Sequence, residues 1–526
     1  MCERRILHRS FPSSPLCSRP VARTPFIRAL DSTFDTLAAA ADNRVGVPAY
    51  FKFLTLLGLR CFLDAGVDVA ILEVGIGGRL DATNVCPPPV VAGIAPLGFD
   101  HMDLLGDTLP AIATQKAGIF KPGSRAFTVP QRVDAAETLA VSSFMREGGR
   151  EEGGRKNRTS CTHALVFPPP QERAAAVNIP LSLAASLADY KAPGGGPGDA
   201  LPLGLRGAHQ ATNASLAVAL AGAFDGWAAA HPGSLPSGAA PPGAADRAAA
   251  LARGELPAEY AAGLATCAWH GRAEVVHDPA SPPSALSFYL DGAHTPESME
   301  TCAHWFASEC GKGVGGAGGA ASPPAEAAVS PPSSPSSPDS ELRLLLFNCM
   351  HERDPRRLLT PLTDTLRARG APLAGAVFVP PDSSYASLGP AEEAKVDLSW
   401  QASLQAVWAD LAASAGRAGG AGGAGGAAAA AVGPPLRLPL LPPSPPRAAA
   451  AAVAASTAAA KAASAAAQHQ DAAAGAVSPS VKSAIEWLRS ASRARPGVRL
   501  RVLVTGSLYL VGDVLRHLGR AEEGGE

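Results

Sequence analysis

Short apolar runs, each followed by turn residues and a helical pattern, constrain the fold of this chain more than any other feature. Two of them lie in the first hundred residues, and three lie after residue 280. The runs are residues 67–74, 90–95, 286–290, 342–347 and 500–504. Strands that alternate with helices favour parallel sheets covered on both faces. The sequence therefore predicts an α/β fold with two domains, divided near residue 271.

Three stretches between these runs have the composition of linkers. Residues 145–158 repeat Arg, Glu and Gly, residues 311–340 are Gly/Ala and then Pro/Ser, and residues 412–480 are almost wholly Ala, Gly, Pro and Ser. Such segments bury too little apolar surface to offset their ordering entropy. We predict that all three are disordered insertions. Residues 313–318 match GxGxxG, but no strand precedes them, so they are not a dinucleotide-binding fingerprint.

Charge and cysteine content exclude several classes of protein. The formal net charge is −1, which argues against a nucleic-acid-binding surface. No apolar run reaches the roughly 18 residues of a membrane span. The nine cysteines include no CxxC pair, which indicates a reducing compartment such as the cytoplasm. The first thirty residues hold six arginines and one acidic residue, so an organellar form with a transit peptide is the alternative.

Polar side chains near the ends of the predicted strands are the first candidates for a site, because open parallel sheets bind ligands at that edge. Glu73 closes the first run ahead of a glycine-rich segment, and His101 follows Asp100 after the second run. Lys116 lies in a predicted short helix, where partial burial lowers a lysine pKa. Each residue also has an ordinary interpretation: an ion pair between Glu73 and Arg79, a surface histidine, and a lysine with an exposed head group.

In combination, these motifs resemble the folylpolyglutamate synthases, which are Mur-ligase-like, ATP-dependent amide-bond ligases. The resemblance begins at Tyr50 and continues in ordered blocks over roughly half of the chain. The blocks are residues 50–131, 205–214, 269–273, 288–299, 346–355 and 502–508. The third block reads Trp-His-Gly-Arg, with His270 where the family motif Trp-Pro-Gly-Arg has proline.

The resemblance implies an architecture and a reaction. Residues 1–271 would form an N-terminal domain with a mostly parallel sheet that binds ATP, magnesium and folate. Residues 272–526 would form a Rossmann-like ligase domain that contains the insertions 311–340 and 412–480. The reaction would activate the γ-carboxylate of tetrahydrofolate or its polyglutamates as an acyl phosphate, which the amine of L-glutamate then attacks. ATP and Mg²⁺ would be required, with a monovalent cation as a further candidate. Separately from the resemblance, we expect a monomer, because nothing in the sequence indicates assembly.

The resemblance also implies three groups of site residues: metal ligands, ATP-binding residues and catalytic residues. One catalytic residue would be a lysine that becomes carbamylated and then serves as a metal ligand, and the other would be a histidine near the transferred phosphate. The residues are Glu73, His101 and Ser14 for magnesium; Arg272, Asp291 and Asn213 for ATP; and Lys116 and His294 for catalysis.

One family element has no counterpart in the sequence. The family begins with a strand and a phosphate loop, but no GxxxxGK[ST] match occurs in this chain. Residues 13–16 only weakly resemble the segment that follows that loop. We therefore expect the N-terminal domain to be truncated at its start. The alternatives are dihydrofolate synthase activity on the same scaffold and a non-catalytic remnant that lacks the loop.

Overall fold

The computed structural model describes residues 21–41, 46, 48–144, 179–194, 201–311, 340–382, 397–418 and 475–519. The predicted insertion at residues 145–158 lies outside these ranges. The chain divides into two units, Met1–Ala268 together with Glu523–Glu526, and Trp269–Glu522. Both units combine helices with a sheet that is wholly or mainly parallel, which confirms the predicted α/β class.

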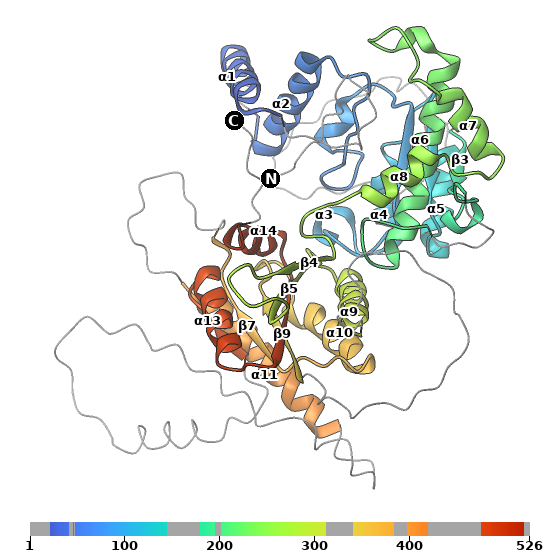
Figure 1. Ribbon diagram of the computed structural model, residues 1–526. Helices are drawn as coiled ribbons and strands as arrows, with labels where there is room; N and C mark the ends of the chain where they lie inside the picture. Colours follow the sequence, from blue (N-terminus) through green and yellow to red (C-terminus); the bar gives the residue numbers. More distant parts are fainter. Residues whose placement is uncertain are drawn as a thin grey trace, which may run out of the picture. The chain divides into compact units, whose positions relative to one another are not determined.

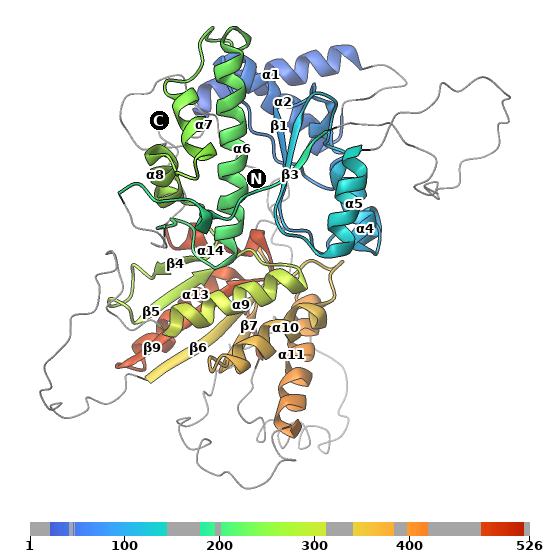
Figure 2. The ribbon, with the colours of Figure 1, turned by 90° about the vertical axis from the view of Figure 1, so that its right-hand side faces the viewer.

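Unit 1 is built around a three-stranded parallel sheet in the order β1-β2-β3. Its strands are β1 (Val91–Ile94), β2 (Arg125–Thr128) and β3 (Leu181–Leu183). Its α-helices are α1 (Arg23–Ala40), α2 (Tyr50–Ala65), α3 (Met102–Leu105), α4 (Leu109–Ala117), α5 (Val133–Phe144), α6 (His209–Ala230), α7 (Ala244–Ala252) and α8 (Ala258–Thr266). Figure 2 shows α6 on one side of β1 and β3, with α4 and α5 on the other side. The sheet is therefore covered on both faces, as a parallel sheet requires.

The long helix α6 is held close to the sheet and to its neighbouring helices. It passes so near β1 that a Cβ atom at Gly93 would lie 2.8 Å from Leu220 Cδ1. On another face of α6, the buried carboxylate of Asp225 accepts hydrogen bonds from Arg247 on α7 and from the Tyr260 hydroxyl on α8. Burial is the largest cause that raises the pKa of Tyr260 well above its ordinary value, and the hydrogen bond to Asp225 is the next largest. The three helices thus form one rigid group.

The predicted strand over residues 67–74 is wrong. This segment is irregular, and among the described strands of unit 1 the edge strand β1 pairs only with β2. The side chain of Ile71 is 71% exposed, although the run reads as a buried strand. An apolar run becomes a strand only when another strand supplies backbone partners on at least one side. No described strand does so here.

Unit 2 contains a six-stranded sheet in the order β4-β5-β9-β6-β7-β8, with β4 antiparallel to β5 and all other neighbours parallel. Its strands are β4 (Glu274–His277), β5 (Leu286–Leu290), β6 (Ser340–Phe347), β7 (Gly375–Phe378), β8 (Gly475–Val477) and β9 (Val498–Thr505). Its α-helices are α9 (Pro296–Gly311), α10 (Pro355–Ala368), α11 (Ser399–Ala418), α13 (Val481–Arg493) and α14 (Leu508–His517). The strands predicted from the runs at 286–290, 342–347 and 500–504 are confirmed.

Helices cover both faces of the unit 2 sheet (Figure 1). Leu345 and Leu503 pack in the core formed with α9, α10 and α11, whereas Leu344 and Val502 pack in the core formed with α13 and α14. Successive residues of a strand point to opposite faces, so a strand buried on both faces is apolar at most positions. This explains why β5, β6 and β9 can be recognised as mainly apolar runs, interrupted by Ser287, Arg343 and Arg501.

A buried ion pair fastens α13 to the turn between β4 and β5. The Asp278 side chain has no exposed surface, and Arg489 Nη2 lies 2.6 Å from Asp278 Oδ1. Burial of Asp278 alone would raise the pKa of its carboxyl group, but hydrogen bonds from Arg489 and Ser281 outweigh burial and lower that pKa. Such a pair locks one arrangement of helix and strand, because either partner alone would be an uncompensated buried charge.

The predicted boundaries of the two C-terminal insertions need correction. Residues 412–418 belong to α11, and residues 475–477 form the edge strand β8. Gly311 is the last residue of α9, and Ser340 is the first of β6. The predicted disorder of residues 312–339 and 419–474 lies outside the described residues. In the part of the chain that the structure describes, no helix is both long and apolar enough to cross a membrane.

Replacing residues 419–474 by a short Gly/Ser linker should change the melting temperature by no more than a few degrees. The free energy of loop closure changes by only about 0.6 kcal/mol for each doubling of loop length. The matched control removes residues 412–480 instead, which also deletes β8 and the end of α11 and should destabilise the chain. Differential scanning calorimetry measures both. A large drop with the shorter deletion would show that residues 419–474 contribute packing.

Candidate active site

Glu73 precedes a loop that is closed by one carboxylate. Asp81 Oδ2 accepts hydrogen bonds from the backbone N–H groups of Gly75 and Ile76, at 3.1 and 3.0 Å. Asp81 Oδ1 accepts from the backbone and the hydroxyl of Thr83, at 2.9 and 2.6 Å. Glu73 itself is exposed and lies in the irregular segment rather than at a strand end. The loop is thus ordered by side-chain hydrogen bonds, not by the sheet.

The same loop is attached to the C-terminal end of α4. Arg79 N–H donates to Gln115 O at 2.9 Å, and Asn84 Nδ2 donates to Gly118 O at 2.9 Å. Gly118 is required at this contact, because a Cβ atom there would lie 2.5 Å from Arg79 Cα. Lys121 Nζ donates to Asn84 O at 2.7 Å and also to Cys86 O. These bonds fix the position of the loop against the helix end that carries Lys116.

Lys116 lies in the last turn of α4, as predicted, and its side chain is half-buried. Burial lowers the pKa of its amine, while the charge of Asp100 acts in the opposite direction. A lowered pKa increases the fraction of neutral amine, which is the form that attacks carbon dioxide or another electrophile. Both interpretations of Lys116, a reactive amine and a buried stem with an exposed head group, stay predictions.

Replacing Thr108 by alanine should lower the free energy of unfolding by about 1 kcal/mol. Thr108 caps α4, since its hydroxyl accepts a hydrogen bond from Ala111 N–H at 3.3 Å. Thr108→Ser keeps the hydroxyl and is the control, with stability close to that of the wild type. Urea denaturation followed by circular dichroism measures both variants. Equal stability of the alanine and serine variants would mean that the cap does not hold α4.

His101 occupies a bend between β1 and α3. Its backbone is left-handed, with φ of 50°, which is uncommon for a residue with a side chain and is tolerated by histidine better than by most. Its Nε2 lies 3.6 Å from Asp100 Oδ2, and its ring is partly exposed. Within the described residues, no group of three or more His, Cys, Asp or Glu side chains forms a metal site. Glu73 and His101 therefore do not build a closed metal centre without further ligands.

The other two sequence-predicted residues of unit 1 have different outcomes. Asn213 lies near the start of α6, where its Nδ2 donates to Gln210 Oε1 at 3.0 Å. The Gln210 amide nitrogen in turn lies 3.0 Å from His209 Nε2. The first turns of α6 thus carry a connected row of polar side chains, and the ATP-binding role of Asn213 stays a prediction. Ser14 lies outside the described residues.

In unit 2, Asp291 shapes the backbone around Arg272. It directly follows β5, and its two carboxylate oxygens accept hydrogen bonds from Ala273 N–H and Ala293 N–H, both at 2.9 Å. Gly292 lies between Arg272 and the α14 residue Leu508, with no room for a side chain. Asp291 therefore binds the backbone directly after Arg272, and the ATP-binding role of both residues stays a prediction.

His294 lies in the loop between β5 and α9, close in sequence to Asp291 but not on a helix. Its Nδ1 lies 2.7 Å from Gly292 O, and its backbone N–H donates to Ser298 Oγ at 3.0 Å. Arg353 Nη1 donates to His294 O at 2.7 Å. Arg353 belongs to a recognised sequence block, but the sequence analysis gave it no role. Its position between β6 and α10, at the same carboxyl edge of the sheet, was the available signal.

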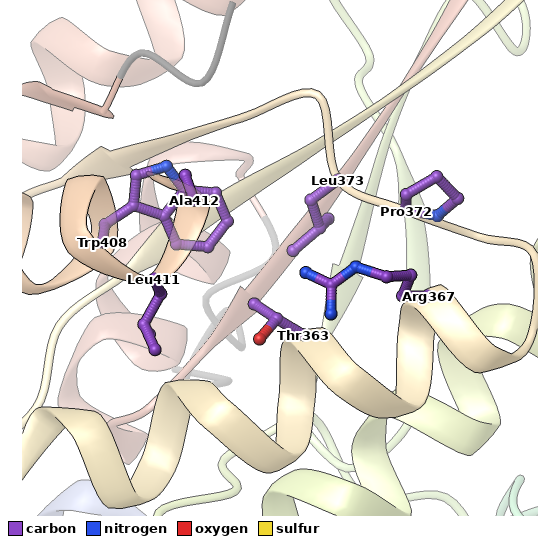
Figure 3. A pocket seen from close by; sticks show the side chains of 7 residues that line it. All are labelled: Thr363, Arg367, Pro372, Leu373, Trp408, Leu411 and Ala412. Carbon is purple, nitrogen blue, oxygen red and sulfur yellow. The ribbon is translucent and has the colours of Figure 1, made fainter. Parts of the chain in front are cut away.

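A separate pocket lies between α10 and α11 (Figure 3). Its volume is about 80 Å³, and it is lined by Thr363, Arg367, Pro372, Leu373, Trp408, Leu411 and Ala412. Arg367 also contacts Asp364 at 2.8 Å. None of the candidate site residues lines this pocket, so it is not part of the candidate active site.

The chain is similar to curated proteins over most of its length. It is 35% identical to a folylpolyglutamate synthase from Arabidopsis thaliana over 521 residues, which cover 95% of this chain and 71% of that relative. A second Arabidopsis folylpolyglutamate synthase is 33% identical over 494 residues, or 92% of this chain and 69% of the relative. The human mitochondrial folylpolyglutamate synthase is 31% identical over 71% of this chain and 53% of its own length.

Solved structures share the fold at lower sequence identity. Mycobacterium tuberculosis folylpolyglutamate synthase complexed with ADP and AMPPCP has a TM-score of 0.55 and 19% identity, covering 98% of this chain and 85% of that chain. E. coli FolC in complex with DHPP and ADP has a TM-score of 0.51 and 17% identity, covering 98% and 82%. No family model matches the chain. The extent of the match to the Arabidopsis proteins establishes that this chain belongs to the folylpolyglutamate synthase family.

Proposed function

We propose that this chain is a folylpolyglutamate synthase, which uses ATP to add L-glutamate to the γ-carboxylate of tetrahydrofolate and its polyglutamates. The observation that carries the proposal is the match to an Arabidopsis folylpolyglutamate synthase over 95% of the chain. The reaction would pass through an acyl phosphate, since a carboxylate must be activated before an amine can attack it. The geometry of the two units supports specific roles for the residues.

Lys116 would be carbamylated in the active protein. Its neutral amine nitrogen would attack the carbon of carbon dioxide and release one proton, which leaves a carboxylate-like anion at a position where a protonated lysine would be cationic. The lowered pKa of the buried amine supports this step, because it provides more of the neutral form near pH 7. The hydrogen bonds from the Glu73 loop to the end of α4 would keep this new anion in a fixed position relative to the loop.

The donor set of unit 1 fits magnesium. Mg²⁺ takes one or two protein carboxylates together with phosphate oxygens, and it keeps several waters. Glu73 and the modified Lys116 would supply the carboxylate oxygens. His101, which follows β1 in the sequence, would be the third ligand. When bound, the ion would neutralise charge on the phosphate oxygens of ATP.

Arg272, Asp291 and Asn213 would bind ATP, and His294 would act near the transferred phosphate. The guanidinium of Arg272 matches phosphate oxygens in both charge and shape. Asp291 would keep Arg272 in place through its bond to Ala273 N–H. Arg353 would orient His294 through the backbone carbonyl of His294. These roles require only preorganised donors that face a developing negative charge.

The decisive experiment is a radiometric or mass-spectrometric assay of ATP-dependent glutamate addition. Tetrahydrofolate and dihydropteroate are offered separately, because the alternative activity, dihydrofolate synthase, acts on dihydropteroate. Elongation of tetrahydrofolate supports the proposal, and exclusive use of dihydropteroate supports the alternative. Loss of activity in Arg272→Gln, with retention in the exposed control Arg369→Gln, ties the reaction to the proposed site. ATP- and folate-binding without turnover would identify a non-catalytic remnant.

We propose a cytoplasmic monomer, with a mitochondrial form as the alternative. The cysteine pattern supports a reducing compartment, whereas the human and bovine relatives carry mitochondrial names. Fractionation of cells that express the chain, together with light scattering of the purified protein, tests both statements. The proposed partners are tetrahydrofolate polyglutamates, L-glutamate and ATP.

A further inference from the structure

The turn that presents Arg272 has an unusual sequence for its shape. Arg272 N–H donates to Trp269 O at 3.2 Å, which closes a four-residue turn from Trp269 to Arg272. The third residue, Gly271, has φ of +75°, as a type II turn requires. Proline is favoured at the second position of such a turn, because it fixes φ there. This chain has His270 at that position, so the turn must be held in another way.

A single carboxylate binds both central residues of the turn. Glu274 Oε2 accepts a hydrogen bond from Gly271 N–H at 2.8 Å, and Glu274 Oε1 lies 3.0 Å from His270 Nδ1. A carboxylate can only accept, so the proton of this contact belongs to the imidazole. Glu274 is the first residue of β4 and pairs with Leu290 of β5. The turn is therefore anchored to the sheet through a side chain.

The other side of the turn packs tightly against α14. A Cβ atom at Gly271 would lie 2.5 Å from Val511 Cγ1 on α14. Ala273 has a left-handed backbone with φ of +47°, and its N–H donates to Asp291. Such a conformation costs free energy, so it persists only where surrounding contacts impose it. Glu274 binds the turn before Arg272, and Asp291 binds the backbone directly after it.

We propose that Glu274 and His270 are positioning residues for Arg272, and that their contact replaces the constraint that a proline would give the turn. This inference rests on the proposed ATP-binding role of Arg272. Glu274 does not touch the nucleotide in this scheme. Glu274 fixes the backbone of the turn that carries the Arg272 side chain. His270 holds Glu274 in the orientation in which it binds Gly271 N–H.

The test compares five variants by their Kd for ATP, measured by displacement of a fluorescent ATP analogue. Glu274→Ala should raise the Kd about 3- to 10-fold, in the range of one net hydrogen bond of roughly 0.5–1.5 kcal/mol. Glu274→Gln keeps an acceptor for Gly271 N–H and should lie between Glu274→Ala and the wild type. His270→Ala should raise the Kd about 2- to 5-fold, and His270→Pro should restore it to near the wild-type value. His277→Ala is the control, because this β4 histidine contacts Ser287 instead.

Two further measurements separate positioning from loss of structure. The affinity for tetrahydrofolate should be unchanged in all variants. Hydrogen exchange of peptide 269–275 should be faster in Glu274→Ala and His270→Ala, and slow again in His270→Pro. An unchanged Kd in Glu274→Ala, or a His270→Pro variant weaker than His270→Ala, overturns the positioning role while wild-type ATP binding stands. A wild-type chain that does not bind ATP overturns the proposed function, and the role of Glu274 with it.

Discussion

Replacing Lys116 by alanine should reduce ATP-dependent glutamate addition at least 100- to 1,000-fold, the usual loss when one preorganised charge-stabilising group is removed from an active site. The variant cannot form the carbamate, so the site loses an anion and a metal ligand together. Folding should be little affected, because alanine favours a helix and α4 keeps its cap at Thr108. The measurement is the rate of tetrahydrofolate elongation at saturating ATP.

Added formate or acetate at high concentration should partly restore the Lys116→Ala variant. A small carboxylate can occupy the space of the missing carbamate and supply the same oxygen ligands. The control is Lys52→Ala, which removes an exposed lysine from α2 and should neither lose activity nor respond to formate. Full activity of Lys116→Ala without additives would rule out the carbamate. Failure of rescue together with a large loss would leave Lys116 as a direct cationic contact.

A strand and phosphate loop of the family type, fused ahead of residue 1, should raise turnover more than 100-fold. The sequence holds no GxxxxGK[ST] match, and a phosphate loop contributes several N–H donors and a lysine at once. Removal of one such donor already costs about 2.7–4 kcal/mol in a charged transition state. The added strand would also provide backbone partners for residues 67–74, which have none in the described sheet of unit 1.

The control for this fusion carries the same strand with Gly-Ala-Gly in place of Gly-Lys-Gly in the loop. It should give residues 67–74 a pairing strand without restoring the full rate. Hydrogen exchange of that segment and the elongation assay report the two effects separately. Equal and substantial turnover by the unmodified chain and the fusion would mean that other residues bind the phosphates.

Strands that are covered on both sheet faces could be predicted from the sequence, whereas segments whose structure depends on a pairing strand could not. Residues 286–290 and 500–504 could be recognised because both sheet faces are covered, which makes most positions apolar, with Ser287 and Arg501 as the exceptions. The segment 67–74 has the same pattern but no described pairing partner. The edge strand β8 was missed for the opposite reason, since Gly-Ala-Val at 475–477 has the composition of the adjoining linker and is a strand only because β7 pairs with it.

The sequence was enough to predict which residue types form the candidate site, but not which contacts hold those residues in place. The polar groups at 291 and 116 stand out from apolar surroundings in the sequence. The groups that act on them come from positions 16 to 18 residues away: the charge of Asp100 acts on the Lys116 pKa, and Ala273 N–H binds Asp291. No periodicity encodes such pairs. The role of Glu274 was invisible for the same reason, because a glutamate at the start of a strand has no distinctive pattern.

The strand order of unit 2 has a consequence for how the protein is made. Among the described strands of unit 2, the last along the chain, β9, lies in the middle of the sheet, between β5 and β6. While the chain emerges from the ribosome, at roughly 5–20 residues per second, β5 and β6 must wait for residues 498–505 before they can pair through β9. Until then the two strands expose backbone edges that can pair with other chains. A truncation anywhere before residue 498 would therefore remove the centre of the sheet rather than its margin, and would leave the edges of β5 and β6 unpaired by β9.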